Sequence, residues 1–224
     1  MAPDAAGGFA VLLDGRSLRG PKGGRVVMPT RALAEMIAEE WAGQGESLDL
    51  ATMHATRLAN TAIDSVPQAR DETAQAIADY AGSDLLCYYA VSPAGLLARQ
   101  IELWSPVLDR AEAEAGLRLV RASGIVHQAQ PPETLARVKT LALGLDDFGL
   151  TGLAFGAPLF GSAVLAIALL KGWIAGEEAF TLSRVDEAWQ EAQWGVDAEA
   201  AERTARLHVE AAMLERWFRG LAAA

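Results

Sequence analysis

The run Phe148-Gly-Leu-Thr-Gly-Leu-Ala-Phe-Gly-Ala-Pro-Leu-Phe-Gly-Ser-Ala-Val-Leu-Ala-Ile-Ala-Leu-Leu170 contains no charged residue. It is long enough to cross a bilayer as one helix. However, glycines and Pro158 interrupt it, and Asp146 and Asp147 stand directly before it where a membrane span would have basic or aromatic flanks. We therefore predict two packed core helices with a break near Gly156-Ala-Pro158, and no membrane insertion.

Composition limits the classes of partner. The chain has 224 residues, 51% hydrophobic and 21% charged, which is an ordinary globular balance with enough apolar material for a core. Its 29 acidic and 19 basic residues give a net charge of −10 and a pI near 4.8. An acidic chain without a lysine and arginine cluster repels a phosphate backbone, so no nucleic-acid partner is expected.

The single cysteine and the N-terminus bear on the compartment. Cys87 cannot form an internal disulfide, and its apolar neighbours predict a buried, unreactive thiol in a reducing compartment. The segment Met1-Ala-Pro-Asp-Ala-Ala-Gly-Gly8 has the pattern of neither a secretory signal nor a transit peptide. The expected location is the cytoplasm.

The first part of the chain has the pattern of a small β meander. Val11-Leu-Leu13 is followed by the turn dipeptide Asp14-Gly15, a short strand near Leu18, a turn at 21–24 and a strand at 26–28. Such a sheet cannot close a core alone, so its apolar face must pack on helices.

Helical signals follow. Thr30 is a suitable N-cap for a helix with the apolar stripe Leu33, Met36, Ile37 and Trp41, which Gly43 and Gly45 terminate. Pro67 separates this region from later helices. The other helices are predicted at 52–64, 68–81, 93–115, 133–143, 177–194 and, with Asp197 as N-cap, to about 219. A hairpin of 117–120 with 125–128 is also predicted.

These elements predict the α+β class, with a small β-rich N-terminal domain at residues 1–66 packed on a larger, mostly helical domain at 67–224.

Catalytic and metal patterns are missing from the sequence. His54, His127 and His208 are scattered without ligand spacing, no Gly-x-Ser-x-Gly elbow occurs, and the glycines fit no nucleotide fingerprint. Gly161-Ser162 falls inside the predicted apolar helix, where serine bonds back to the preceding turn. We expect no enzyme activity, no metal and no cofactor.

One helix face in the N-terminal part is polar. Arg57, Asn60, Thr61 and Asp64 recur at helical spacing and can satisfy one another. We interpret this face as a buried joint between the two domains, and the alternative is a ligand or partner site.

The segment Ser183–Gly195 carries the main candidate for a binding surface. At helical spacing Val185, Ala188, Trp189 and Ala192 form one stripe, whereas Trp194 falls on the other side with Glu187 and Glu191. An exposed indole among carboxylates resembles a contact patch. The alternative is that Trp194 folds back as a plug at the helix end.

Several segments together resemble the chaperones that hold the free alpha subunit during assembly of F1 ATP synthase in mitochondria and alphaproteobacteria. The matching segments, in family order, are Val11–Leu18, Met28–Thr30, Ala38–Trp41, Thr52–Met53, Thr56–Asp64, Asp84–Tyr88, Ser183–Glu187, Gln190 and Trp194–Gly195. The family usually has one more aromatic and basic strand before Val11. Either this chain is shortened there or its sheet lacks an edge strand.

The resemblance implies an ATP-independent chaperone that binds the alpha subunit until the beta subunit arrives. It implies a client-facing patch of Asp186, Glu187, Glu191 and Trp194. Trp41 belongs to the family pattern too, but we interpret it as structural, tying its helix to the sheet. The missing transit-peptide pattern and the alanine- and glycine-rich composition favour a bacterial cytoplasmic protein, and a processed organellar protein is the alternative. For eukaryotic members of the family the resemblance implies the mitochondrial matrix.

Two alternatives stay open at this point. One is an enzyme or small-molecule binding protein with a site between the domains, using Arg57, Asn60 and Asp64. The other is a peripheral membrane protein that uses the apolar run 148–170.

Overall fold

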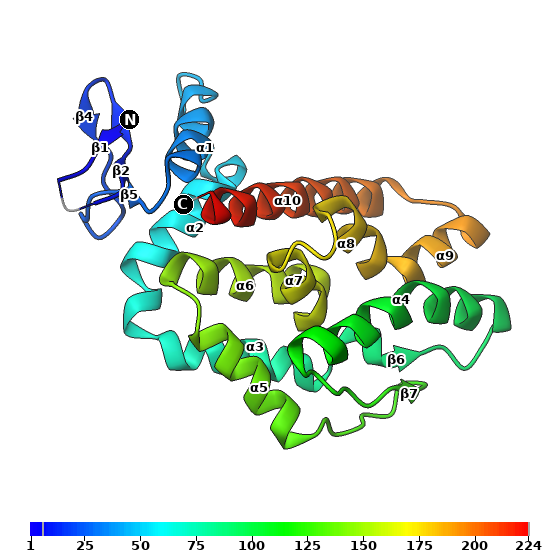
Figure 1. Ribbon diagram of the computed structural model, residues 1–224. Helices are drawn as coiled ribbons and strands as arrows, with labels where there is room; N and C mark the ends of the chain where they lie inside the picture. The colour runs from blue at the N-terminus through cyan, green and yellow to red at the C-terminus, as the bar shows by residue number, and fades with distance from the viewer. Residues whose placement is uncertain (6, 224) are drawn as a thin grey trace.

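A computed structural model describes residues 1–5 and 7–223 of the chain. Figure 1 shows a small strand region at the N-terminal end and a larger helical body beside it. This arrangement confirms the predicted α+β class and the segregation of its elements. The proposed division between residues 66 and 67 remains a prediction.

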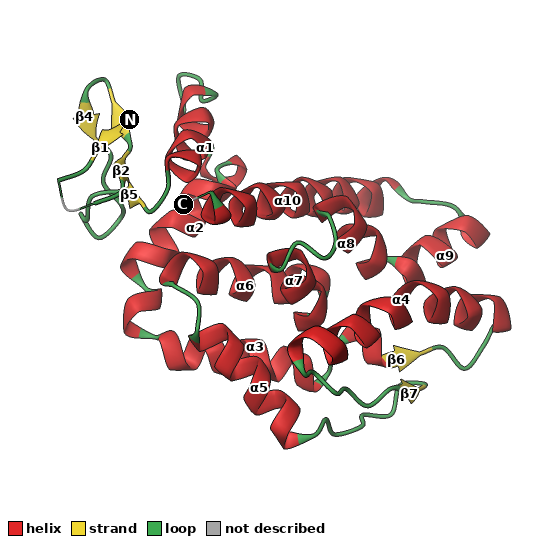
Figure 2. Cartoon of the chain, viewed as in Figure 1, coloured by secondary structure: helices red, strands yellow, loops and turns green. Residues whose placement is uncertain are grey.

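The N-terminal strands are short and antiparallel. They are β1 (Ala2–Pro3), β2 (Phe9–Ala10), β3 (Leu12–Leu13), β4 (Arg16–Ser17) and β5 (Val27–Met28). The first sheet has the order β1-β2-β5, and β3 pairs with β4 as a hairpin. Figure 2 shows these strands gathered beside α1, as a sheet that needs helical cover requires.

The hairpin turn follows from its sequence. Asp14 and Gly15 have φ angles of 49° and 77°. Positive φ at both central residues is the type I′ geometry, and Asp-Gly is a preferred pair for it. The predicted turn is confirmed.

Of the two alternatives for the segment before Val11, the one in which the sheet lacks an edge strand is wrong. Ala2 pairs with Ala10, and Pro3 pairs with Phe9. Main-chain hydrogen bonds do not require aromatic or basic side chains. Proline is tolerated on an edge strand because the outer side of that strand has no neighbouring strand to which a backbone N–H must donate.

Ten α-helices lie in the described residues, and their ends agree with most of the sequence signals. They are α1 (Arg31–Ala42), α2 (His54–Asp64), α3 (Arg70–Gly82), α4 (Ala94–Ala115), α5 (Pro132–Leu143), α6 (Asp147–Phe160), α7 (Ala163–Leu170), α8 (Gly176–Ser183), α9 (Val185–Trp194) and α10 (Ala198–Ala222). Three 3-10 turns lie at Leu50–Thr52, Val66–Gln68 and Leu85–Cys87. Thr30 and Asp197 cap α1 and α10 through side-chain bonds, as predicted.

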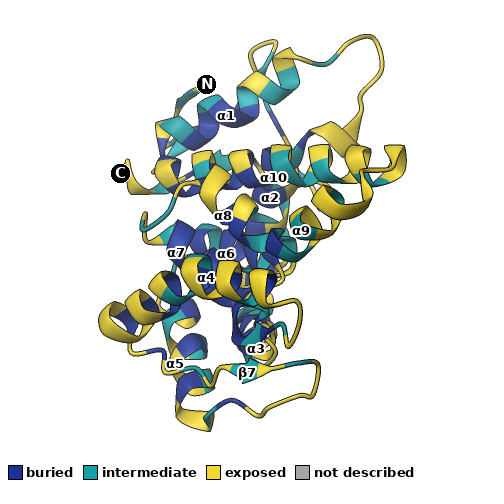
Figure 3. Ribbon diagram, turned by 90° about the vertical axis from the view of Figure 1, so that its right-hand side faces the viewer, coloured by how far each residue is buried: buried dark blue, intermediate teal, exposed yellow. Residues whose placement is uncertain are grey.

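The apolar run forms the centre of the core. Every residue of α7 except Leu170 is buried, and α6 packs against α7, α2, α3 and α10. Figure 3 shows α6 and α7 as the buried layer beneath more exposed helices. In the part of the chain that the structure describes, no helix combines the length and apolarity needed to cross a membrane.

The predicted break near Gly156 is wrong in its position. The helix α6 continues through Gly156 and Pro158 to Phe160, and the chain turns at Gly161, whose φ is 62°. A Cβ on Gly156 would lie 2.9 Å from Leu214 and 3.0 Å from Ala166, so this glycine permits close helix packing instead of ending the helix. Ser162, which was expected inside a helix, is the N-cap of α7 and accepts a bond from the Leu165 amide.

The predicted hairpin between 117–120 and 125–128 is also wrong. Strand β7 (Ala122–Ser123) pairs in parallel with β6 (Tyr88–Tyr89). The side chain of Gln130 instead bonds both backbone groups of Val120, at 2.7 and 3.0 Å. Those groups are therefore not available to a neighbouring strand.

The predicted single helix at 177–194 is two helices, with a break at Arg184. The φ of Arg184 is −120°, and its amide bonds to the Thr181 carbonyl. The indole of the buried Trp104 donates to the Leu182 carbonyl at 2.9 Å. A distant side chain thus takes the carbonyl that a continuous helix would offer to residue 186.

Candidate functional site

The two tryptophans of α9 differ in environment. Trp189 is partly buried against α4, where a Cβ on Gly95 would come within 2.7 Å of its ring. Trp194 is 80% exposed, so the alternative of a folded-back plug is wrong. Of the predicted inward stripe, Val185 is buried and Trp189 is partly buried, but Ala188 and Ala192 are exposed.

Asp186 faces α4 and lies outside the cleft described below. Its Oδ1 accepts a bond from Nε2 of Gln100 at 2.6 Å, and Oε1 of the same glutamine accepts the Ala90 amide at 2.7 Å. Gln100 is buried. Asp186 therefore fixes the start of α9 to α4, and a buried polar bridge of this kind sets the position of the helix.

The opposite side of α9 carries the other acidic residues. Arg184 bonds Glu191 at 3.0 Å and lies 4.0 Å from Glu187. The side chain of Arg184 is 15% exposed, whereas that of Glu187 is 52% exposed. Arg184 thus holds one carboxylate firmly and leaves the other largely in solvent.

A cleft of about 680 Å³ lies between α9 and the first turns of α10. Its volume is typical of sites that enclose a ligand or a few side chains. Its apolar wall consists of Leu85, Leu159, Phe160, Phe180 and Leu207. Its charged and aromatic border includes Glu187, Glu191, Trp194, Asp197, Glu199 and Arg203.

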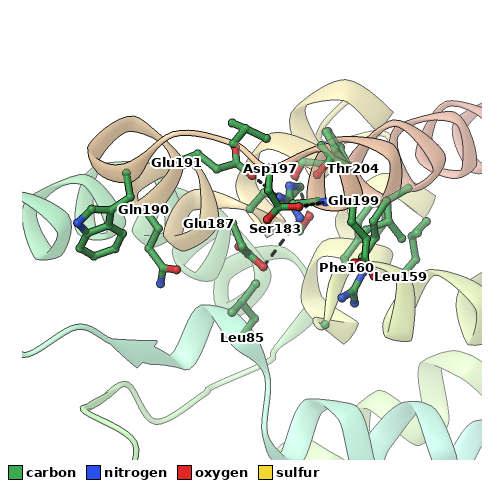
Figure 4. A pocket seen from close by; sticks show the side chains of 18 of the residues that line it. Leu85, Leu159, Phe160, Ser183, Glu187, Gln190, Glu191, Asp197, Glu199 and Thr204 are labelled. Carbon is green, nitrogen blue, oxygen red and sulfur yellow. Dashed lines mark hydrogen bonds and ion pairs between the residues drawn. The ribbon is translucent and has the colours of Figure 1, made fainter.

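The end of α9 gives the cleft its shape. Gly195, with φ 85° and ψ 172°, redirects the chain, and Asp197 then accepts the Ala200 amide at 2.9 Å to begin α10. Figure 4 shows Glu187 and Gln190 projecting from α9, with Asp197, Glu199 and Thr204 on the α10 side.

The sequence-derived patch is thus only partly assembled. Glu187, Glu191 and Trp194 line the cleft, but Asp186 does not. Sequence reasoning missed the apolar wall that Leu85 and Phe160 contribute from distant segments, and it missed Arg203 on the border. Nothing in the local pattern marks these residues.

The polar face of α2 lies against the N-terminal loop. Oδ2 of Asp64 accepts the Lys22 amide at 3.2 Å, and the Lys22 ammonium donates to the Asp64 carbonyl at 2.7 Å. A Cβ on Gly20 would lie 3.1 Å from both Asn60 and Asp64. Arg57 is exposed and does not join this contact.

Trp41 is partly buried on α1 and packs against the core, and α1 contacts β2 and β5. Within the described chain, its Nε1 is enclosed without a hydrogen-bond partner. The structural role assigned to Trp41 stays a prediction.

The histidines occupy separate places. His54 lies 3.5 Å from Glu210, His127 bonds the Tyr88 hydroxyl at 3.1 Å, and His208 contacts Glu177. Over residues 1–5 and 7–223, no three histidine, cysteine, aspartate or glutamate side chains group as metal ligands.

Two titratable groups are buried near the turn before β6. Burial raises the pKa of the Asp84 carboxyl to about 6, although bonds from Ser162, Val164 and Leu86 oppose this shift. Burial, with the nearby Asp84, raises the pKa of the Cys87 thiol to about 12. The thiol therefore stays protonated and buried, as the sequence predicts.

Comparison with known proteins supports the family resemblance. The family model described as "ATP12 chaperone protein" matches residues 1–112. Protein atp12, mitochondrial, of Schizosaccharomyces pombe is 26% identical over 202 residues, which cover 84% of this chain and 69% of that protein.

Solved structures match almost the whole chain. Atp12 from Paracoccus denitrificans is 38% identical, with a TM-score of 0.90 and coverage of 97% of this chain and 93% of that one. The Atu1473 protein of Agrobacterium tumefaciens is 38% identical, with a TM-score of 0.92 and coverage of 98% and 82%. The resemblance identified in the sequence is confirmed, and the chain belongs to the ATP12 chaperone protein family.

Proposed function

We propose that this protein is an ATP-independent assembly chaperone that binds the free alpha subunit of F1 ATP synthase. It covers the interface of that subunit until the beta subunit arrives. The family membership supports the chaperone class. The observation that carries the site assignment is the cleft between α9 and α10, bordered by an indole that is 80% exposed.

The physical problem that such a chaperone solves is premature exposure of an apolar surface. Obligate oligomer interfaces are large and resemble a core cut in half, so an unassembled subunit aggregates. A protein that binds this surface stabilises the free subunit by mass action and needs no chemical energy. Transient binding then lets the correct partner displace it.

The cleft has the composition of such a contact. Trp194 is a rigid aromatic side chain that can bury a large area on a client, and aromatic residues often dominate binding energy. Glu187 and Glu191 place negative charge around it, and charges at an interface border accelerate encounter more than they slow release. Asp186 acts as a positioning residue, since it bonds Gln100 and fixes α9 to α4.

We further propose that the protein works by binding and not by catalysis, in the cytoplasm of a bacterium. Among the residues that the structure describes, the side chains lining the cleft include Ser183 and Thr204 but no histidine or cysteine. The hydroxyl of Ser183 donates to the Phe180 carbonyl at 2.7 Å, so it is not paired with a base. The enzyme alternative used α2, which Figure 1 places at the opposite end of the helical body from α9.

Replacing Trp194 by alanine tests the site assignment. We expect Trp194→Ala to weaken binding to isolated alpha subunit by about 30-fold, because loss of an aromatic anchor costs about 2 kcal/mol. Binding is measured by biolayer interferometry on immobilised alpha subunit. The far-UV spectrum is expected to be unchanged, because the side chain is mostly in solvent.

The matched control is Val209→Ala, which removes an apolar side chain that is 55% exposed on α10 and lies outside the cleft. Its affinity is expected to equal that of the unchanged protein. Equal losses in both variants, or no loss in Trp194→Ala, would remove the cleft from the proposed function.

A further inference from the structure

We infer that the cleft between α9 and α10 recognises an extended client segment in which an arginine lies next to a large apolar side chain. The inference rests on the proposed function and names the chemistry of the bound segment. It follows from four properties of the cleft: the material of its wall, the balance of its charges, the place of its exposed indole and the spread of its lining over several elements.

The wall of the cleft requires an apolar group. Phe160 is 2% exposed at the end of α6, and Leu85, Leu159 and Phe180 are partly buried beside the core. An apolar side chain that enters here removes hydrocarbon from water on both partners, which stabilises the complex in proportion to the buried area. A purely charged segment would leave this wall without a partner.

The charges of the cleft require a cation. Its carboxylates belong to Glu187, Glu191, Asp197 and Glu199, and its guanidiniums belong to Arg184 and Arg203. Two of the four carboxylates are already engaged, because Glu191 bonds Arg184 and Asp197 caps α10. Glu187 reaches Arg184 only at 4.0 Å and its side chain is 52% exposed, so Glu187 on α9 and Glu199 on α10 are the carboxylates left to a ligand.

The two arginines do not cancel this preference. Arg184 is 15% exposed and is committed to Glu191, with Glu187 at 4.0 Å. Arg203 lies one helical turn after Glu199 on α10, so it offsets one carboxylate at most. The lining stays net negative in a chain whose net charge is −10.

The exposed indole favours arginine over lysine. Trp194 lies on the border of the cleft, with most of its ring in solvent. A guanidinium can stack on an indole face while its N–H groups reach a carboxylate, whereas an ammonium is a compact and strongly hydrated charge. An arginine between Trp194 and Glu187 would make both contacts.

The cleft also suits a polypeptide better than a compact metabolite. Its lining comes from the turn at residue 85, the end of α6, helices α8 and α9, and the first turns of α10. Val196, next to Trp194, is 55% exposed, so the border continues as an open surface along the α9–α10 connection. An extended chain can follow that border and insert one side chain.

Fluorescence anisotropy with labelled, capped ten-residue peptides tests the inference on the full-length protein. The first probe alternates leucine and arginine, the second leucine and lysine, the third leucine and glutamate, and the fourth glycine and arginine. We expect the leucine and arginine peptide to bind at least about tenfold more tightly than each of the others, with an affinity that falls as salt rises. Equal binding of all four peptides would overturn the inference.

Charge reversal gives a second readout that does not depend on general attraction to an acidic protein. In Glu187→Lys/Glu199→Lys, the preference is expected to move from the arginine peptide to the glutamate peptide. The control Glu46→Lys/Glu102→Lys makes the same change in net charge at exposed sites outside the cleft, and it should keep the original preference. If both double variants behave alike, the charge assignment is wrong.

A milder variant guards against misfolding. If the lysine pair lowers the helical content, Glu187→Gln/Glu199→Gln removes the charges without repulsion and should reduce the arginine preference. Capture of alpha subunit is measured in parallel. Capture without a peptide preference rejects this inference and leaves the proposed function standing, whereas failed capture rejects the proposed function whatever the peptides do.

Discussion

Trp217→Ala is expected to lower the free energy of unfolding by about 4 kcal/mol, the usual cost of removing a large buried aromatic side chain. Trp217 on α10 is fully buried, and its ring centroid lies 6.3 Å from that of Phe148. Its Nε1 also donates to the Phe148 carbonyl at 3.1 Å, so the variant loses a buried hydrogen bond in addition to packing. Urea unfolding followed by circular dichroism measures the loss.

The neighbouring atoms cannot close the resulting cavity without moving the central helices. A Cβ on Gly152 would already lie 3.0 Å from Trp217, which shows how closely α6 and α10 approach. The matched control is Trp194→Ala, the same substitution at an exposed position, with an expected change below about 0.5 kcal/mol. Similar losses in the two variants would show that α10 does not seal the core in the way described.

Asp84→Asn is expected to change the pH dependence of stability. The carboxylate accepts bonds from the Ser162 hydroxyl at 2.6 Å, the Val164 amide at 3.0 Å and the Leu86 amide at 3.1 Å. It thereby joins the turn before β6 to the start of α7. Asparagine keeps the volume, but its NH₂ group has no lone pair for one of these donors, at a cost of about 1–3 kcal/mol.

The sign of the pH effect follows from the raised pKa. Burial raises the pKa of Asp84 from 3.8 to about 6 in the folded protein. Between these two pH values the folded state therefore holds a proton that the unfolded state has released. The stability contributed by the protonated carboxyl is complete below pH 3.8 and is lost as the pH rises through about 6. The loss is up to about 3 kcal/mol, at 1.36 kcal/mol per unit.

Because all other titrating groups are common to both proteins, the difference between wild type and Asp84→Asn isolates this carboxyl. That difference is expected to be largest near pH 4 and to shrink by up to about 3 kcal/mol by pH 7. Urea unfolding at several pH values measures it. A difference that stays constant, or grows with pH, would contradict the buried placement of Asp84.

Local signals in the sequence were sufficient for most helix ends and turns. Thr30 and Asp197 cap helices through bonds three residues along the chain, and Asp14-Gly15 supplies the backbone angles of its turn. The exposed face of α9 with Trp194 was also predictable, because helical spacing separates it from Val185. In each case the determining atoms are neighbours in sequence.

The errors arose where a distant side chain determines the local structure. The carboxylate of Asp84 bonds Ser162 and helps to place the start of α7 after Gly161. The indole of Trp104 binds the Leu182 carbonyl, where α8 ends. No window of local sequence contains these pairs.

In the candidate site, too, the residues that are close in sequence were predictable and the distant ones were not. Glu187, Glu191 and Trp194 lie within one helix and were identified from their spacing, whereas Phe160 and Leu85 join the cleft only through tertiary packing. Asp186 is acidic like Glu187 and Glu191, but its side chain faces Gln100. A single position along a helix changes the direction of a side chain by about 100°.

The most direct test of the proposed function is the aggregation of isolated F1 alpha subunit, followed by light scattering in a buffer without ATP. With an equimolar amount of this protein, scattering is expected to fall by about tenfold, because the bound fraction of the client no longer self-associates. Serum albumin at the same concentration should leave scattering unchanged. If alpha subunit aggregates equally in the presence of both proteins, it is not the client, and the account of the cleft as its binding site is wrong.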